Sequence, residues 1–365
     1  MNIGIDGYEA NVVHRVGIGQ YAFQLLWQFY KLDNQNRYTI FLPHEPLSDM
    51  PPIRLGWKYV VGRPGNLWTI QQLPNLIKPH QLQLFFSPTH YIPWFTAIPR
   101  LMSIMDLSFL HYPEMFRKKD LWQLKHLTQF SVKRARKIFT ISEFSKNEIH
   151  AYYKYPLEDI TVTYPGVTLL SETQNTQDKK EATLKKFGIT NKYILFVGTI
   201  QPRKNITRLI RAFELLKAEY QLVLVGKKGW LYEPIMADAQ ELISQNKALF
   251  LDFVSTQDLQ LLYQCAACFV LPSLYEGFGL PVIEALHEGC PVVVSQNSSL
   301  PEVTGEAGIY VNPMDVADIA NGIIKAVQLT AEEREKRKQL GLAYIKKFNW
   351  ENCAKKTLEV FDSLV

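Results

Sequence analysis

The sequence predicts an α/β protein made of two doubly wound, Rossmann-like domains. Short apolar runs alternate with amphipathic helical patterns along the chain, which is typical of parallel strands buried on both faces. The length of 365 residues is enough for two domains that each bury a sizeable core. Because doubly wound sheets bind ligands at the carboxyl ends of their strands, we expect the two domains to face each other across a cleft.

The N-terminal domain is expected to span residues 1–170. Its predicted strands are residues 2–6, 38–42, 83–87, 100–105 and 137–141. Helical patterns cover residues 19–32, 119–135 and 143–153. The polar stretch 171–183 is interpreted as a linker or exposed loop.

A second series of elements restarts at Tyr193 and predicts a C-terminal domain over residues 180–346. The expected strands are residues 193–198, 221–225, 249–254, 268–272, 291–295 and 308–311. The expected helices are residues 204–218, 230–244, 257–266, 280–288 and 315–328.

Composition indicates an ordinary globular protein, with 47% hydrophobic and 21% charged residues. We expect no transmembrane helix, because no apolar run approaches 18 residues, and no signal peptide, because Met1–Asp6 has the pattern of a strand. Four cysteines suit a reducing compartment, so the predicted location is cytoplasmic. Cys265 and Cys268 could bind a metal or undergo redox cycling, but without a second CxxC pair a buried structural role is the favoured interpretation.

The most informative segment is EGFGLPVIE, from Glu276 to Glu284, which follows an apolar run and precedes a helical pattern. Gly277 and Gly279 allow backbone amides to approach a ligand closely, and Pro281 suits a first helical turn. Free amides at a helix start, together with the helix dipole, favour an anion such as a phosphate. This segment therefore predicts a phosphate site with a carboxylate on each side.

The spacing of Glu276 and Glu284 limits what these carboxylates can do. On one continuous helix they would be separated by about 12 Å of rise. A retaining glycosidase pair needs about 5–5.5 Å between its carboxyl groups. We expect Glu276 in the loop and Glu284 two turns into the helix, with one binding a sugar ring, the other a ribose, and a diphosphate between them. The alternative is an ordinary strand–turn–helix with two solvated glutamates.

This E-x7-E arrangement with an internal GFGLP resembles the donor-site signature of retaining nucleotide-sugar glycosyltransferases of family 4. The string GTIQPRKN, from Gly198 to Asn205, also resembles the family, although many members carry an arginine at the position of Thr199. Arg203 and Lys204 stand at an expected helix start, where they oppose the helix dipole and need an anion to compensate them. A diphosphate would do so; a solvated basic turn is the alternative.

Two segments of the first domain extend the resemblance. Gly17 and Gly19 match a GIGRY-like loop that lies near the donor diphosphate in the family, although a plain turn explains them almost as well. Asp106 ends a predicted strand, after Met105 at a position where many members carry histidine. Asp106 is therefore the candidate to orient an acceptor hydroxyl or stabilise positive charge at the anomeric carbon. Its alternative role is to cap the following turn.

Residues 116–137 hold eight Lys or Arg against Asp120 alone, with aromatic and leucine side chains interleaved. This pattern predicts either a helix on an anionic lipid surface or a solvated basic helix face. Nucleic-acid binding is not expected, because no recognition motif accompanies the charge.

The resemblance runs from about residue 2 to 364 and implies the GT-B fold, with residues 351–365 forming a helix that packs back on the first domain. It implies a retaining enzyme that moves a hexose from a nucleotide diphosphate sugar to a glycan or lipid-linked acceptor. Contact of residues 116–137 with lipid would place this cytoplasmic enzyme at the inner face of the membrane. GDP-mannose is the preferred donor, because the PRKN variant is common among mannosyltransferases of the family. No cofactor and no metal are expected, since the chain lacks a DxD triplet.

The expected roles follow from the same resemblance. Arg203 and Lys204 neutralise the diphosphate, and Glu284 binds the ribose hydroxyls. Glu276 holds the sugar together with the amides of Phe278, Gly279 and Leu280. Two other functions remain open from sequence alone: a nucleotide-sugar epimerase of the same architecture, and a non-catalytic protein that binds sugar nucleotides.

Overall fold

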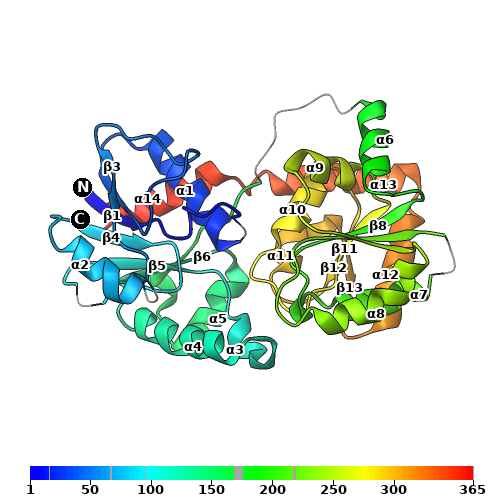
Figure 1. Cartoon of the computed structure of the whole chain (residues 1–365), viewed down its shortest axis with the longest axis horizontal. Helices are drawn as coiled ribbons and strands as arrows, with labels where there is room; N and C mark the ends of the chain where they lie inside the picture. Colours follow the sequence, from blue (N-terminus) through cyan, green and yellow to red (C-terminus); the bar gives the residue numbers. More distant parts are fainter. Residues whose placement is uncertain (16, 66–67, 95, 168–175, 217–218, 365) are drawn as a thin grey trace. The chain divides into compact units, whose positions relative to one another are not determined.

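The computed structural model describes residues 1–15, 17–65, 68–94, 96–167, 176–216 and 219–364. The chain divides into two compact units. The first unit comprises Met1–His111, Lys118–Gly166 and Phe348–Val365, and the second comprises Tyr112–Arg117 and Val167–Lys347. In each unit a parallel sheet lies between two layers of helices (Figure 1).

The sheet of the first unit has the strand order β3-β2-β1-β4-β5-β6-β7, with every neighbouring pair parallel. Its strands are β1 (Asn2–Asp6), β2 (Arg37–Leu42), β3 (Trp57–Val61), β4 (Leu84–Ser87), β5 (Arg100–Ile104), β6 (Lys137–Thr140) and β7 (Ile160–Val162). Its helices are α1 (Ile18–Leu32), α2 (Leu73–Ile77), α3 (Ser108–His111), α4 (Lys118–Val132), α5 (Glu143–Tyr153) and α14 (Trp350–Asp362), with short turns η1 (Trp68–Gln72) and η3 (Leu157–Asp159). The strand order reverses between β1 and β4, which is the switch point of a doubly wound sheet.

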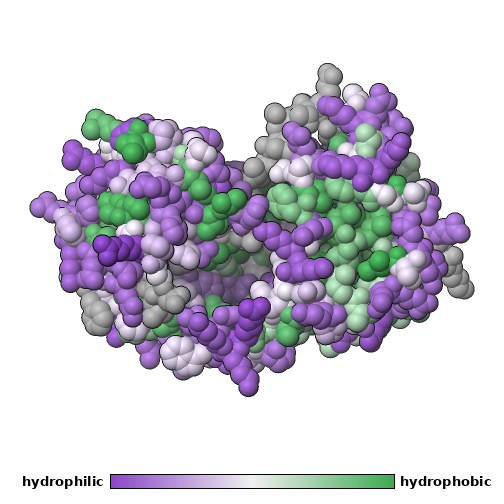
Figure 2. Space-filling model, in the orientation of Figure 1, coloured by the Kyte–Doolittle hydropathy of each residue, from purple (hydrophilic) through white to green (hydrophobic). Residues whose placement is uncertain are grey.

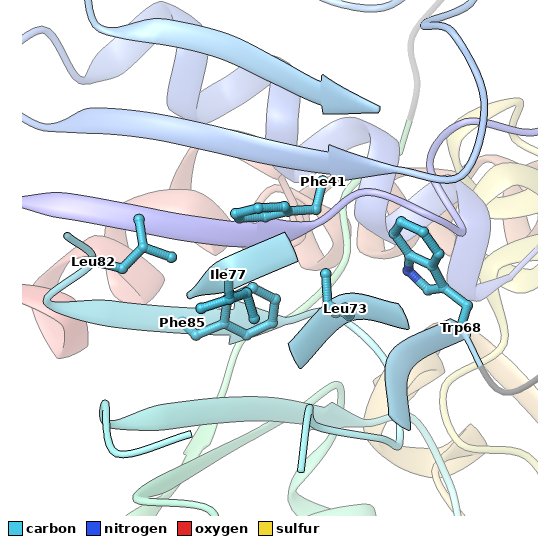
Figure 3. Close-up of a cluster of buried hydrophobic side chains, with 6 residues drawn as sticks. All are labelled: Phe41, Trp68, Leu73, Ile77, Leu82 and Phe85. Atoms are coloured by element: carbon cyan, nitrogen blue, oxygen red, sulfur yellow. The ribbon is translucent and has the colours of Figure 1, made fainter. Parts of the chain in front are cut away.

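The last helix, α14, completes the core of the first unit. The ring of Phe361 is fully buried and contacts Phe29 of α1, Phe86 of β4 and Phe139 of β6, at centroid distances of 5.8, 5.4 and 6.2 Å. A separate apolar cluster packs α2 and η1 against β2 and β4 (Figure 3). It consists of Phe41, Trp68, Leu73, Ile77, Leu82 and Phe85. The fold of the first unit therefore depends on a segment more than 180 residues beyond Gly166, the end of its preceding segment.

The second unit repeats the same plan, with the strand order β10-β9-β8-β11-β12-β13 and parallel pairing throughout. Its strands are β8 (Tyr193–Val197), β9 (Gln221–Val225), β10 (Ala248–Leu251), β11 (Cys268–Leu271), β12 (Val292–Ser295) and β13 (Gly308–Val311). Its helices and turns are η2 (Pro113–Met115), α6 (Gln177–Lys186), η4 (Pro202–Lys204), α7 (Ile206–Glu214), α8 (Glu233–Ser244), α9 (Thr256–Cys265), α10 (Leu280–His287), α11 (Leu300–Thr304), η5 (Gly305–Ala307), α12 (Val316–Val327) and α13 (Ala331–Ile345). In Figure 1, α7, α8 and α12 cover one face of this sheet and α9, α10 and α11 the other.

The predicted alternation of strands and helices is confirmed, but several elements differ from the sequence prediction. β3 and β7 were not predicted, and neither was α13. The stretch 171–183 was predicted as a linker or loop, yet Gln177–Lys186 forms α6, with the Thr176 side chain accepting from the Lys179 amide at its start. Residues 171–175 of that prediction lie outside the described residues, as do 217–218 of the helix expected at 204–218.

Candidate active site

The second unit places two loops at its switch point, between the neighbouring strands β8 and β11. Parallel strands end at the same edge of a sheet, so the loop after β8, which holds η4, lies beside the loop between β11 and α10. The side chain of Asn205 ties these loops together, since its Nδ2 donates to the buried carbonyl oxygens of Pro272 (2.9 Å) and Pro313 (2.7 Å). Asn205 has φ +59°, a left-handed conformation that asparagine tolerates well.

Glu276 and two cations form a buried ionic cluster across these loops. Lys204 Nζ lies 2.6 Å from Glu276 Oε1, and Arg203 Nη1 lies 3.3 Å from Glu276 Oε2. Ser273 Oγ donates to Oε1 at 2.6 Å. Only 5% of Glu276 and 8% of Lys204 is exposed, so this cluster is part of the protein interior rather than a solvated turn.

The charges of this cluster fix the ionisation of Glu276. Burial alone would raise the pKa of Glu276, but the charges of Lys204 and Arg203 and the hydrogen bonds from Lys204 and Ser273 lower that pKa to about 2. Glu276 is therefore ionised at neutral pH. Two cations against one carboxylate leave the cluster with a net positive charge, which suits an anionic ligand.

This geometry changes one interpretation of Arg203 and Lys204. Both were expected at a helix start, but they lie in the turn η4, and α7 begins only at Ile206. The anion that the sequence argument required is present within the protein itself, as Glu276. A solvated basic turn, the alternative interpretation, is wrong because Lys204 is buried.

The start of α10 offers the predicted anion-binding amides. Gly279 precedes the helix with φ +107°, and Pro281 lies in the first turn. Among the described residues, the amides of Gly279 and Leu280 have no hydrogen-bond acceptor. Ser299 Oγ donates to the carbonyl of Glu276 at 2.9 Å, which holds the loop that leads into the helix.

Glu284 lies on α10, but nearer to its start than predicted. It was expected two turns into the helix; because α10 begins at Leu280, it is one turn in. Its Oε2 accepts a hydrogen bond of 3.0 Å from the hydroxyl of Tyr263. Burial raises the pKa of Glu284, and the bond from Tyr263 opposes that rise. Glu276 in the loop and Glu284 on the helix thus flank the start of α10.

In the first unit, Asp106 caps the turn that follows β5. Its Oδ1 accepts from the amide and the hydroxyl of Ser108, at 2.9 and 2.6 Å, as the alternative interpretation of Asp106 predicted. The amide of the preceding Met105 donates to Nε2 of His90, at 3.2 Å. Burial lowers the pKa of His90, so the imidazole is neutral at neutral pH.

Gly17 and Gly19 surround the start of α1. Gly17 precedes the helix with φ +51° and ψ −111°. A Cβ at Gly19 would lie 2.9 Å from the carbonyl oxygen of Glu9, so close packing already requires glycine there. The structure therefore explains both glycines by backbone geometry, and their proposed contact with a donor remains a prediction.

Sequence reasoning missed several residues that hold the candidate site in place. Ser273 could have been suspected from its position three residues before Glu276, a common spacing for a local hydrogen bond. Tyr263 and Asn205 gave no local signal, because their partners lie on other elements. Within the described ranges no group of three or more His, Cys, Asp or Glu side chains could hold a metal ion. Cys268 is buried at the start of β11, and Cys265 is partly buried at the end of α9.

Comparison with known proteins agrees with this architecture. Residues 179–345 match the family model for glycosyl transferases group 1, and residues 17–169 match that for glycosyltransferase family 4. The O-antigen chain mannosyltransferase B of Escherichia coli is 32% identical over 346 residues, which cover 92% of this chain and 85% of that protein. The chain belongs to the family 4, group 1 glycosyltransferases.

A second relative supports the family assignment, and a solved structure supports the fold. The O-antigen chain mannosyltransferase RfbU of Salmonella typhimurium is 31% identical over 254 residues, covering 70% of this chain and 67% of that protein. The crystal structure of Anabaena HepE in complex with UDP-glucose has a TM-score of 0.76 at 17% identity, covering 99% of each chain. The fold is GT-B, with two Rossmann-like domains, and the protein is a glycosyltransferase. These findings do not favour the epimerase or the non-catalytic alternative.

Proposed function

We propose that the enzyme is a retaining, metal-independent transferase that moves a hexose from a nucleoside diphosphate sugar to a glycan or lipid-linked glycan. One observation carries the proposal: a net positive, buried cluster of Arg203, Lys204 and Glu276 lies beside the start of α10. Preorganised positive charge of this kind stabilises a departing diphosphate without a metal ion.

The leaving group interacts with the cations and the helix start. Lysine carries three donors and arginine five, so each can bind both Glu276 and a phosphate oxygen. The amides of Gly279 and Leu280 add donors at the positive end of the α10 dipole. As the bond from the anomeric carbon to the diphosphate breaks, these groups stabilise the charge that develops on the phosphate oxygens.

The two glutamates hold the ends of the donor. Glu284 accepts hydrogen bonds from the ribose hydroxyls, since one of its oxygens is held by Tyr263 and the other is not. Glu276, with the amides of Phe278, Gly279 and Leu280, positions the hydroxyls of the sugar. Because the pKa of Glu276 is about 2, this carboxylate acts as a charged acceptor and not as a proton donor at neutral pH.

The acceptor is assigned to the first unit. Asp106 is proposed to orient the attacking hydroxyl, and Gly17 and Gly19 are proposed to contribute to donor binding, as the resemblance of their segments to the family implies. The acceptor oxygen forms its bond on the face from which the diphosphate leaves, and its proton passes to the departing phosphate oxygen. The configuration at the anomeric carbon is then retained, and no cofactor is needed.

GDP-mannose is the proposed donor. The support comes from relatives that are named mannosyltransferases and are more than 30% identical to this chain. The test is a panel of nucleoside diphosphates and their sugars, measured by thermal stabilisation and by product analysis. GDP-mannose should stabilise the protein most, and Glu284→Ala should weaken its binding by at least tenfold. Unchanged donor affinity in Glu284→Ala would remove Glu284 from the site.

The stereochemical and metal predictions need separate measurements. NMR of the product should show the same anomeric configuration as the donor sugar, and EDTA should leave the rate unchanged. An inverted product, or a rate that EDTA abolishes and Mn²⁺ restores, would contradict this part of the proposal.

We also propose that α4 contacts an anionic membrane surface on the cytoplasmic side. Leu127, Thr128, Ser131 and Val132 form its buried face. On the opposite face, Lys118, Lys119 and Trp122 are exposed, with 59% of Trp122 accessible. The surface over α3 and α4 is largely hydrophilic (Figure 2). A basic face with an exposed tryptophan matches a headgroup interface, which attracts lysine and accommodates an amphipathic ring. No helix among the described residues is long and apolar enough to span a bilayer.

Vesicle flotation tests this contact. The protein should float with vesicles that contain phosphatidylglycerol but not with pure phosphatidylcholine, and the fraction bound should fall as salt is raised. Lys118→Glu/Lys119→Glu should abolish flotation. The matched control is Lys336→Glu/Lys338→Glu, the same charge change on exposed residues of α13. Equal flotation of the two variants would rule out α4 as the contact.

A further inference from the structure

Glu284 is held by a tyrosine from a different helix. Tyr263 lies on α9, is only 2% exposed, and packs its ring against Phe269 of β11 at 5.7 Å between centroids. Its hydroxyl donates to Glu284 Oε2 at 3.0 Å. Among the described residues this is the single hydrogen bond made by the Glu284 carboxylate.

The direction of this bond is fixed by chemistry. Burial raises the pKa of Tyr263 well above its ordinary value, and the nearby charge of Glu284 raises it further. The phenol therefore keeps its proton and always donates. Glu288 and Cys290 also face Tyr263, but Glu288 accepts its own bonds from Gln260 and Gln264.

A glutamate side chain has three rotatable bonds, so a carboxylate with no partner samples many orientations. One hydrogen bond from a buried, rigid ring removes most of that freedom. It fixes Oε2 and leaves Oε1, on the same carboxylate, oriented for a second donor. A ribose offers such donors through its 2′ and 3′ hydroxyl groups.

We propose that Tyr263 is a positioning residue, which holds the Glu284 carboxylate in the orientation that binds the ribose hydroxyls of the donor. This inference rests on the proposed function of Glu284. Ribose recognition would then depend on a residue of α9, Tyr263, as well as on Glu284 in the segment from Glu276 to Glu284.

Tyr263→Phe tests the proposal because it removes the hydroxyl and keeps the ring. The matched control is Tyr193→Phe. Tyr193 lies on β8 and is 1% exposed, and its hydroxyl donates at 2.6 Å to the carbonyl of Leu262, which neighbours Tyr263 on α9. Each variant loses one tyrosine hydrogen bond, but only Tyr263→Phe loses a bond to Glu284. The probe is the nucleoside diphosphate, among ADP, CDP, GDP and UDP, that binds the wild type most tightly by calorimetry.

Tyr263→Phe should raise the Kd of this nucleotide about tenfold, as expected for losing a bond to a charged group, while Tyr193→Phe leaves it unchanged. The 2′,3′-dideoxy form of the same nucleotide should bind wild type and Tyr263→Phe equally. The Tyr263 hydroxyl lowers the pKa of Glu284, so its loss should move the acid limb of nucleotide binding to higher pH.

The outcomes separate this inference from the proposed function. If Glu284→Ala weakens binding but Tyr263→Phe alters neither Kd nor the pH profile, Tyr263 is not a positioning residue. If the losses in Tyr263→Phe and Glu284→Ala simply add in the double variant, the role of Tyr263 is structural only and the inference is wrong. If Glu284→Ala binds as the wild type does, the proposed function of Glu284 fails.

Discussion

Replacing Glu276 by glutamine tests the ionic cluster most directly. The wild-type pKa of Glu276 is about 2, against an ordinary value of 4.5. At about 1.36 kcal/mol for each pH unit, this difference corresponds to about 3 kcal/mol of stability at neutral pH. A similar cost is expected for removing the charge that faces a buried cation, so Glu276→Gln should lower the free energy of unfolding by about 3 kcal/mol at pH 7.

The sign of the pH dependence follows from the lowered pKa. The stabilisation by Glu276 is complete above pH 4.5 and is lost progressively as the pH falls from 4.5 to about 2, because in this range the unfolded chain binds a proton that the folded protein does not. The wild type and Glu276→Gln should therefore differ by only about 1 kcal/mol at pH 3.

Urea unfolding at pH 7 and pH 3 measures both values. Glu335→Gln is the control, because it removes a carboxylate from an exposed position on α13. Equal stability of Glu276→Gln and the wild type at pH 7 would refute the reasoning. So would a difference that stays constant between pH 7 and pH 3, since a packing defect does not titrate.

Three further predictions concern the same unit. Lys204→Ala should lower kcat more than donor affinity, because the charge of Lys204 acts chiefly on the leaving group; steady-state kinetics would contradict this if only KM rose. Gly279→Ala should cost about 1–2 kcal/mol in urea unfolding, since φ is +107° and the new Cβ would lie 2.9 Å from Leu300 Cδ2. Gly188→Ala, with φ +69° and open space around it, should cost less; an equal cost would show that crowding at Gly279 is unimportant. Thr330→Ala should cost about 1 kcal/mol, because it removes the capping box at the start of α13; an unchanged melting temperature would contradict this.

The strands with continuous apolar runs could be predicted from sequence, whereas the edge strands β3 and β7 of the first sheet were missed. β8 and β9 are buried at every position, so their runs are unbroken. β3 is an edge strand in which only Trp57 is fully buried, and Lys58 interrupts its short apolar run. α6 was missed because its sequence, QDKKEATLKK, is polar on nearly every face, and only Thr183 is buried.

In the candidate site, too, some features could be predicted from the sequence and others could not. Glu276, Gly279, Pro281 and Glu284 lie in one short segment, so local rules for loops and helix starts were enough to place them. Partners brought together by the sheet were not predictable, because strand neighbours that are far apart in sequence determine them. The pairing of Lys204 with Glu276 joins residues 72 positions apart and arises only from the adjacency of β8 and β11.

The position of α14 has a consequence for biosynthesis. Phe361 fills the centre of the first unit, between Phe29, Phe86 and Phe139. A ribosome must therefore translate the whole second unit before the first can close its interior. Until then, those three aromatic rings stay uncovered on the nascent polypeptide, so the half that is made first matures last and depends longest on chaperones.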